Sequence, residues 1–336
     1  LVVNQTTTAA VRGAVILGTP GVAGGDVRIE SASKLRSTVK ALPVGSGSAG
    51  TDNVGVGIAF ALNLITDETV SAIEQNASVT GARNITMTAN ARVDAETEAR
   101  MGASTTGGSA SVAPAIAITS SVVTTSVIIA PIDGDNLLEL SGSLSAVAQQ
   151  RASAKTTAGA QAQGGSSAAV GVGLALTISD HAVIARTDRD ITAGGGIEFG
   201  ALGSSHNETH ASASASGAAP KSQNDTDTTK TSGGSVADKL FNQRDFADKT
   251  GKDNGGKGTG GASGNPKAES SDGEVSVAAA IALTIVDASA IAVLPQGRTL
   301  TAGGAVVLRS SENVDGITTA DGTAVKATSA GIGAAV

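Results

Sequence analysis

A similar apolar stretch, here called the apolar line, occurs four times along the chain. This repetition limits the possible folds more than any other feature. The line reads VGVGIAFALNLI from Val54, SVAPAIAIT from Ser111, VGVGLALTI from Val170 and SVAAAIALTI from Ser276. When Leu62, Ile118, Leu176 and Leu283 are taken as equivalent, the spacings are 56, 58 and 107 residues. The chain therefore repeats a unit of roughly 57 residues, and one unit carries about 50 more.

A second landmark gives the same period. It is a glycine-containing turn that leads into a short strand, and it recurs at AGGDVRIES, TGARNITMTA, DGDNLLELS, AGGGIEFGA and AGGAVVLRS. Spacings of 58, 53, 59 and 109 residues follow when the equivalent positions are Val27, Ile85, Leu138, Ile197 and Val306. Two landmarks with one period predict a single stacked array over residues 1–336. The closing AGIGAAV resembles the start of a fifth line, so we expect a longer parent chain.

The extra residues of the long unit lie at 218–272, which is rich in Gly, Ser, Thr, Asn, Asp and Lys. This composition predicts a low-complexity insertion in place of a short turn. Residues 235–249 within it read as a short amphipathic helix that Ser235 caps. The predicted contacts with a partner are its apolar residues Leu240, Phe241 and Phe246. The alternative is that this segment is a flexible loop without a binding role.

Each unit contains two long stretches that alternate with period 2. Between Ala146 and Ala162, alanines alternate with polar residues such as Arg151 and Lys155. A helix would scatter these alanines around its circumference, whereas a strand places them on one face. In the apolar line, bulky residues such as Leu174 alternate with small ones such as Ala175. We expect the bulky face of this second strand to pack inward against the alanine face, leaving the small residues outside.

The predicted core is thin, because aromatic residues make up 1% of the chain, with four Phe and no Trp or Tyr. These patterns predict an all-β fold, a parallel β-solenoid with long Ala- and Val-rich strands. One wide coil per unit is favoured over three coils of about 19 residues, because no shorter repeat is evident. The alternatives are an Ala-rich helical array and a membrane helix over 276–294, which Asp287 interrupts.

The AGG turns, the alternating Ala/Ser runs and the VGVG lines together resemble the repeats of giant bacterial surface exoproteins. These include filamentous-haemagglutinin-like proteins, autotransporter passengers and large repetitive adhesins. The resemblance covers most of the chain apart from 218–272, and it departs from the family because coils of about 20 residues are not evident. It implies secretion, a right-handed parallel β-solenoid and a role as a stalk, adhesin or cell-surface fibre.

Charge and motif content exclude several functions. The net charge of −7 disfavours nucleic-acid binding, which needs a basic surface. No cysteine is present, and neither a G-x-S-x-G elbow nor a P-loop occurs. We therefore expect a protein without enzymatic activity, cofactor or membrane span.

Two polar clusters are weak metal candidates. DGDN places Asp133 and Asp135 on a turn, where carboxylates can bind Ca²⁺, although a plain turn is favoured. HNETH places His206, Glu208 and His210 on one face of a strand, an arrangement that can bind Zn²⁺. A solvated polar face is favoured there.

The small residues of the apolar lines form the main predicted site. Stacked in register, they would make a smooth exposed surface, and burial under another part of the chain is the alternative. The residues assigned to this self-association face are Gly55, Gly57, Ala59, Ala61, Ala115, Ala117, Gly171, Gly173, Ala175, Ala280 and Ala282. The sequence thus predicts an extracellular structural or adhesive segment that self-associates into a fibre, sheath or stalk. The alternative is a binding module for a carbohydrate, a receptor or a flat surface such as ice.

Overall fold

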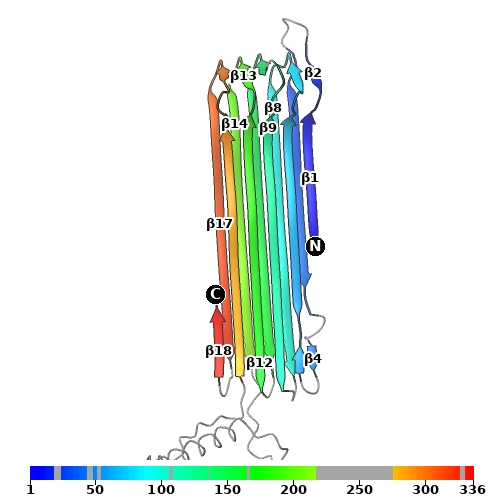
Figure 1. Ribbon diagram of the computed structural model, residues 1–336, viewed down its shortest axis with the longest axis vertical. Helices are drawn as coiled ribbons and strands as arrows, with labels where there is room; N and C mark the ends of the chain where they lie inside the picture. The colour runs from blue at the N-terminus through cyan, green and yellow to red at the C-terminus, as the bar shows by residue number, and fades with distance from the viewer. Residues whose placement is uncertain are drawn as a thin grey trace, which may run out of the picture.

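A computed structural model describes residues 1–336 except 19–23, 44–47, 51–53, 106–108, 135, 165–166, 217–274 and 326–329. These described ranges contain strands and turns but no helix. Most strands are parallel and belong to two large sheets, which lie face to face as a flat slab (Figure 1). The predicted all-β parallel solenoid is confirmed.

Sheet 1 has the order β1-β6-β9-β12-β15-β18, with β5 also paired to β9. Its strands are β1 (Val2–Val11), β5 (Val54–Val56), β6 (Ala59–Ile73), β9 (Ala110–Ile129), β12 (Ala168–Thr187), β15 (Val275–Val293) and β18 (Ala330–Ala335). Every apolar line of the sequence lies in this sheet.

Sheet 2 has the order β17-β14-β11-β8-β3, with β4 also paired to β8. Its strands are β3 (Val27–Ala41), β4 (Ser48–Gly50), β8 (Ile85–Thr105), β11 (Leu144–Gln163), β14 (Ile197–Ser216) and β17 (Val306–Val325). Two small sheets close the upper corner in Figure 1: β2 (Ala14–Ile16) with β7 (Ser78–Thr80), and β10 (Leu137–Leu140) with β13 (Asp190–Ala193) and β16 (Leu300–Ala302).

One repeat unit forms one wide coil. From the upper corner, β8 runs the length of the slab, a turn reverses the chain, and β9 returns it to β10. The next unit stacks on it in register, so that Leu176 pairs with Ile118 and with Leu283. The apolar-line spacing therefore corresponds to the pairing register of sheet 1.

The second landmark is correct except at Leu138. Ile85 pairs with Leu144, which in turn pairs with Ile197. Leu138 instead pairs with Ile191 in the corner sheet. The error arose because the DGDN turn precedes the short strand β10, whereas a later turn precedes the long strand β11.

Both helical alternatives are wrong for the described residues, since the apolar stretch over 276–294 lies almost entirely in strand β15. The insertion 218–272 and its predicted helix at 235–249 lie outside the described residues. The flanking strands β14 and β15 keep the register of the array, because Ile197 of β14 pairs with Val306 and Leu283 of β15 pairs with Leu176.

The core changes its composition along the strands. In the upper half, next to the short strands, the inward side chains are large, and the fully buried ones include Ile85, Met87, Ile129, Leu144 and Phe199. In the lower half, the inward residues are alanines from both sheets, such as Ala117, Ala160 and Ala213. The upper core therefore contains bulky side chains, and the lower core contains methyl groups.

A row of hydroxyl groups crosses the core just above the alanine region and is buried except at its β15–β17 end, where Thr284 is partly exposed and Thr318 is exposed. Seven threonines, taken alternately from the two sheets, are joined by hydrogen bonds of 2.6–2.7 Å between their Oγ1 atoms: Thr97, Thr119, Thr156, Thr177, Thr209, Thr284 and Thr318. An alanine core alone specifies register weakly, because positions two residues apart are equivalent. This threonine row distinguishes one level from the next.

Candidate interaction face

The predicted orientation of the apolar lines is wrong. Ala59, Ala61, Ala115, Ala117, Ala175, Ala280 and Ala282 are all buried in the core, and Gly55, Gly57, Gly171 and Gly173 are buried on the same side of their strands. The small residues of sheet 1 face the alanines of sheet 2 and do not form an outer surface. The alternative of burial within the chain is the one that the structure shows.

The two sheets approach so closely in the lower half that two glycines are required there. A Cβ atom on Gly173 would lie 2.5 Å from the carbonyl oxygen of Ser212, and one on Gly171 would lie 2.5 Å from that of Ser214. Backbone packs against backbone at these points, and a bulky inward side chain would force the sheets apart.

The bulky residues of the same lines consequently face outward. We call this surface the apolar face, and it comprises Val54, Val56, Ile58, Phe60, Leu62, Leu64, Val112, Pro114, Ile116, Ile118, Val170, Val172, Leu174, Leu176, Ile178, Val277, Ala279, Ile281, Leu283, Ile285 and Ile332. Phe60 is 55% exposed and Leu283 is 48% exposed. The face extends across five neighbouring strands of sheet 1, from β6 to β18.

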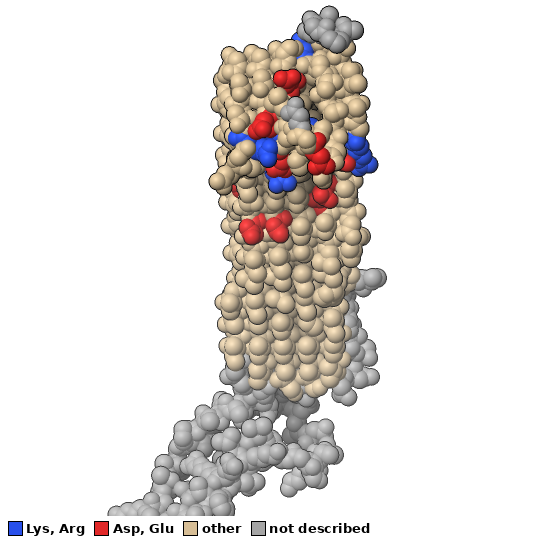
Figure 2. All heavy atoms as spheres, turned by 45° about the horizontal axis from the view of Figure 1, so that its top comes forward, with Lys and Arg blue, Asp and Glu red and all other residues tan. Residues whose placement is uncertain are grey.

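The apolar face carries no charge. On the face seen in Figure 2, acidic and basic side chains gather on the upper part and none appears on the lower part. The first charged level above the apolar face holds Asp180 and Asp287, which are paired neighbours on β12 and β15 and are both exposed. No ion pair involves either carboxylate within the described residues. A flat apolar area thus ends at a pair of like charges.

The outer face of sheet 2 is polar, and its charges pair across the strands. Lys155 Nζ lies 2.8 Å from Glu208 Oε2, and Lys40 Nζ lies 2.9 Å from Glu96 Oε1. Hydrogen bonds from Lys155 and His206 lower the pKa of Glu208. Such exposed pairs stabilise a fold weakly. This face has the ordinary character of a solvated surface.

The metal candidates do not form a ligand set among the described residues. His206 Nε2 lies 3.2 Å from Glu208 Oε1, so these two side chains meet, but Glu208 also binds Lys155. His210 lies on the same strand two residues beyond Glu208. Asp133 accepts a hydrogen bond from Asn76, and Asp135 lies outside the described residues.

The predicted partner contacts Leu240, Phe241 and Phe246 also lie outside the described residues. In the part of the chain that the structure describes, no helix is long and apolar enough to cross a membrane.

His181 is a buried histidine that was not predicted from the sequence. His181 is 1% exposed, and its ring nitrogens lie 2.8 Å from Ser205 Oγ and 3.3 Å from Ser121 Oγ. Burial lowers the pKa of His181 to about 4. The alternation along β12 could have predicted this burial, because His181 lies on the same face of the strand as Thr177 and Ser179.

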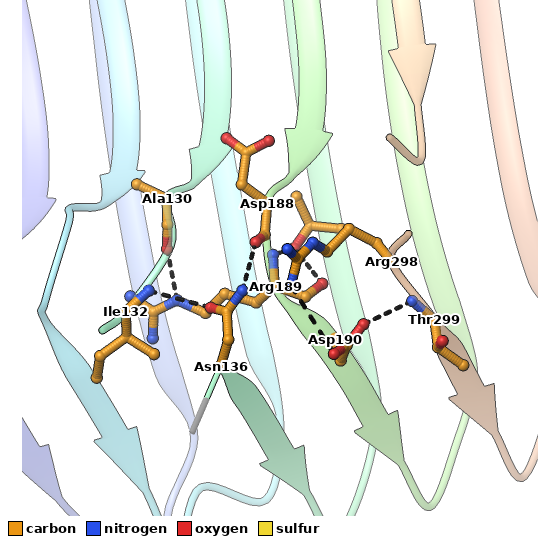
Figure 3. A network of polar contacts seen from close by, with 9 residues as sticks. Ala130, Ile132, Asn136, Asp188, Arg189, Asp190, Arg298 and Thr299 are labelled. Carbon is orange, nitrogen blue, oxygen red and sulfur yellow. Dashed lines mark hydrogen bonds and ion pairs between the residues drawn. The ribbon is translucent and has the colours of Figure 1, made fainter. Parts of the chain in front are cut away.

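A buried arginine connects three coils at the upper corner (Figure 3). Arg189 donates from Nε to the carbonyl of Ala130 and from Nη2 to that of Glu74 at 3.2 Å. Burial lowers the pKa of Arg189. The neighbouring acids bind elsewhere, because Asp188 faces Arg186 and Asp190 faces Arg298. The guanidinium thus binds the carbonyl of Ala130 and shares that of Glu74 with the backbone N–H of Ala77, which ties the turns of three coils together.

Comparison with known proteins identifies no relative. No family model, curated protein or solved structure matches the chain.

Proposed function

We propose that this chain is a non-enzymatic structural segment of a bacterial extracellular surface protein, and that copies associate through the apolar face. One observation carries the proposal: the lower half of sheet 1 turns its bulky aliphatic residues to the outside and its small residues to the core. Bulky residues on the outside do not stabilise the isolated slab, but they would stabilise a contact with another surface.

The size of the apolar face is close to that of a specific interface. Four strands that carry about nine residues each, and β18 with six, give a footprint of roughly 650 Å² at about 4.8 Å between strands and about 3.3 Å per residue. Stable complexes bury about 800 Å² on each partner. The largest apolar patch on a typical monomer covers only about 300–600 Å². A second copy supplies a surface of equal size, flatness and chemistry.

The flatness of the slab supports the same proposal. The long strands of both sheets are nearly straight and run side by side (Figure 1). Sheets of many strands normally twist, and flat ones are typically stabilised by stacking. A flat apolar face fits another flat face over its whole area.

Sedimentation velocity on a matched pair of double variants tests the proposal. L174K/I281K places two charges on paired neighbours within the apolar face, and I184K/I291K places them on paired neighbours of the same strands in the upper half. We expect the natural chain and I184K/I291K to dimerise or form larger species. The dissociation constant of L174K/I281K should rise about 100-fold or more. A natural chain that stays monomeric, or equal losses in both variants, would refute the proposal.

A second function is favoured by a groove on the outside of sheet 2. The groove has a volume of about 570 Å³, and Arg100, Gln161, Ser212, Asp321 and Thr323 are among its lining residues. These hydrogen-bonding side chains suit a polar chain such as a polysaccharide. Calorimetric titration with soluble polysaccharides would show saturable binding that R100A/D321A removes, and absence of heat would exclude this role.

A further inference from the structure

The apolar face is asymmetric along the strand, and this asymmetry selects one way of pairing two copies. Its lower edge is apolar, and its upper edge ends at the exposed carboxylates of Asp180 and Asp287. We infer that two copies pair face to face with their strands antiparallel and their solenoid axes pointing in the same direction. The inference rests on the proposed self-association and specifies its geometry.

Two symmetric arrangements bring the apolar faces together. A two-fold axis parallel to the strands keeps the strands parallel and reverses the order of stacking, so β9 of one copy faces β15 of the other. A two-fold axis parallel to the solenoid axis reverses the strands and keeps the order of stacking. Both arrangements place Leu174, at the middle of the face, opposite its counterpart.

The two arrangements differ in where the carboxylates go. With parallel strands, Asp180 of one copy would face Asp180 of the other, and each Asp287, one strand away, would lie opposite Val122, so four carboxylates would gather at one level of the interface. No described cation is paired with them, and like charges facing each other in an interface oppose binding strongly. With antiparallel strands, Asp180 lies opposite Ala168 and Asp287 lies opposite Val275, at the lower edge of the partner's sheet. The carboxylate pairs of the two copies are then about 40 Å apart, so they do not repel each other strongly.

The inferred geometry has a consequence for assembly. Because both solenoid axes point the same way, further coils added to each copy would extend in one direction and stay side by side. The same contact can then repeat along the axis, since the apolar line recurs in every unit.

Crosslinking of single-cysteine variants distinguishes the two arrangements, and it is clean because the natural chain has no cysteine. The variants are Leu174→Cys, Ile178→Cys and Val170→Cys, all on β12 and all outward. A short bismaleimide is added under conditions in which sedimentation shows a dimer. Residues 170 and 178 are about 26 Å apart along the strand, beyond the reach of a short linker.

We expect Leu174→Cys to crosslink to itself, and a mixture of Val170→Cys and Ile178→Cys to crosslink at least about tenfold better than either variant alone. The double variant D180N/D287N should lose this preference. A dimer in which Ile178→Cys crosslinks mainly to itself overturns the inferred orientation but leaves self-association standing. A dimer without crosslinking at Leu174→Cys excludes the apolar face, and a monomer at every concentration overturns the proposed function itself.

Discussion

The upper and lower halves of the slab use the same strands in opposite ways. In the upper half, Phe199 and Ile129 face inward, and polar residues such as Arg186 face outward. In the lower half, Ala175 and Ala213 face inward, while Leu174 and Ile281 face outward. The upper half has its largest side chains in the core, although some bulky residues such as Ile291 face outward there as well.

The lower half is therefore not optimised for its own core. Alanine and glycine bury little apolar area, so the lower half gains less from burial than the upper half does. Its bulky residues can gain that free energy only from another surface. The lower half is therefore the part of the molecule that we assign to contact with a second copy.

The largest expected effect contrasts two phenylalanines. Phe199→Ala removes a fully buried ring from the upper core and should destabilise the fold by about 3–5 kcal/mol. Phe60→Ala removes an exposed ring from the apolar face and should change the stability of the monomer by less than about 0.5 kcal/mol. Denaturant unfolding of both variants at a concentration that keeps the chain monomeric checks this contrast. Equal losses of stability would remove the distinction between the two halves.

The buried His181 between the two halves predicts a pH dependence. Its pKa in the folded chain is about 4, below the ordinary 6.5, so the unfolded chain takes up the proton first as the pH falls. Stability should therefore drop as the pH is lowered from about 7 to about 4, by a total of about 3 kcal/mol.

The variant His181→Gln keeps a hydrogen-bonding side chain and should flatten this pH dependence. Denaturant midpoints measured over the same pH range give the comparison. Parallel curves for the natural chain and His181→Gln would exclude His181 as the titrating group.

A third prediction concerns the close approach of the sheets in the lower half. Gly173→Val inserts a branched side chain at a position where even an added Cβ would lie 2.5 Å from a backbone oxygen. The variant should destabilise the fold by about 1–3 kcal/mol. Ala279→Val is the control, because it places the same side chain on the outward face of a neighbouring strand. Thermal unfolding should separate the two variants, and a harmless Gly173→Val would contradict the thin lower core.

The smallest expected effect concerns the threonine row. Thr177→Val keeps the shape of the side chain but removes the hydroxyl that joins Thr156 to Thr209. The expected loss is about 1–2 kcal/mol, because two buried hydrogen bonds are removed. Thr124→Val, outward on the neighbouring strand, serves as the control in the same denaturant titration. A larger loss in the control would show that the row contributes nothing specific.

The sequence allowed the fold and the register of sheet 1 to be predicted, because Leu62, Ile118, Leu176 and Leu283 are neighbours in the structure. The direction of the apolar lines was not predicted correctly, because both faces of these strands are uncharged in the lower half. Size alone then favoured bulky residues inside. Asp180 carries the information that was needed, because it lies on the same face of β12 as the bulky residues from Val170 to Ile178. An exposed carboxylate at that phase places the bulky residues outside as well.

Cryo-electron microscopy of the purified chain, at concentrations where it associates, would show directly whether copies pair through the apolar face. We expect paired slabs in contact through the lower half of sheet 1, with strands of the two copies antiparallel and solenoid axes pointing the same way. Isolated slabs, or slabs joined through the polar face of sheet 2 with the apolar face in water, would contradict the claim.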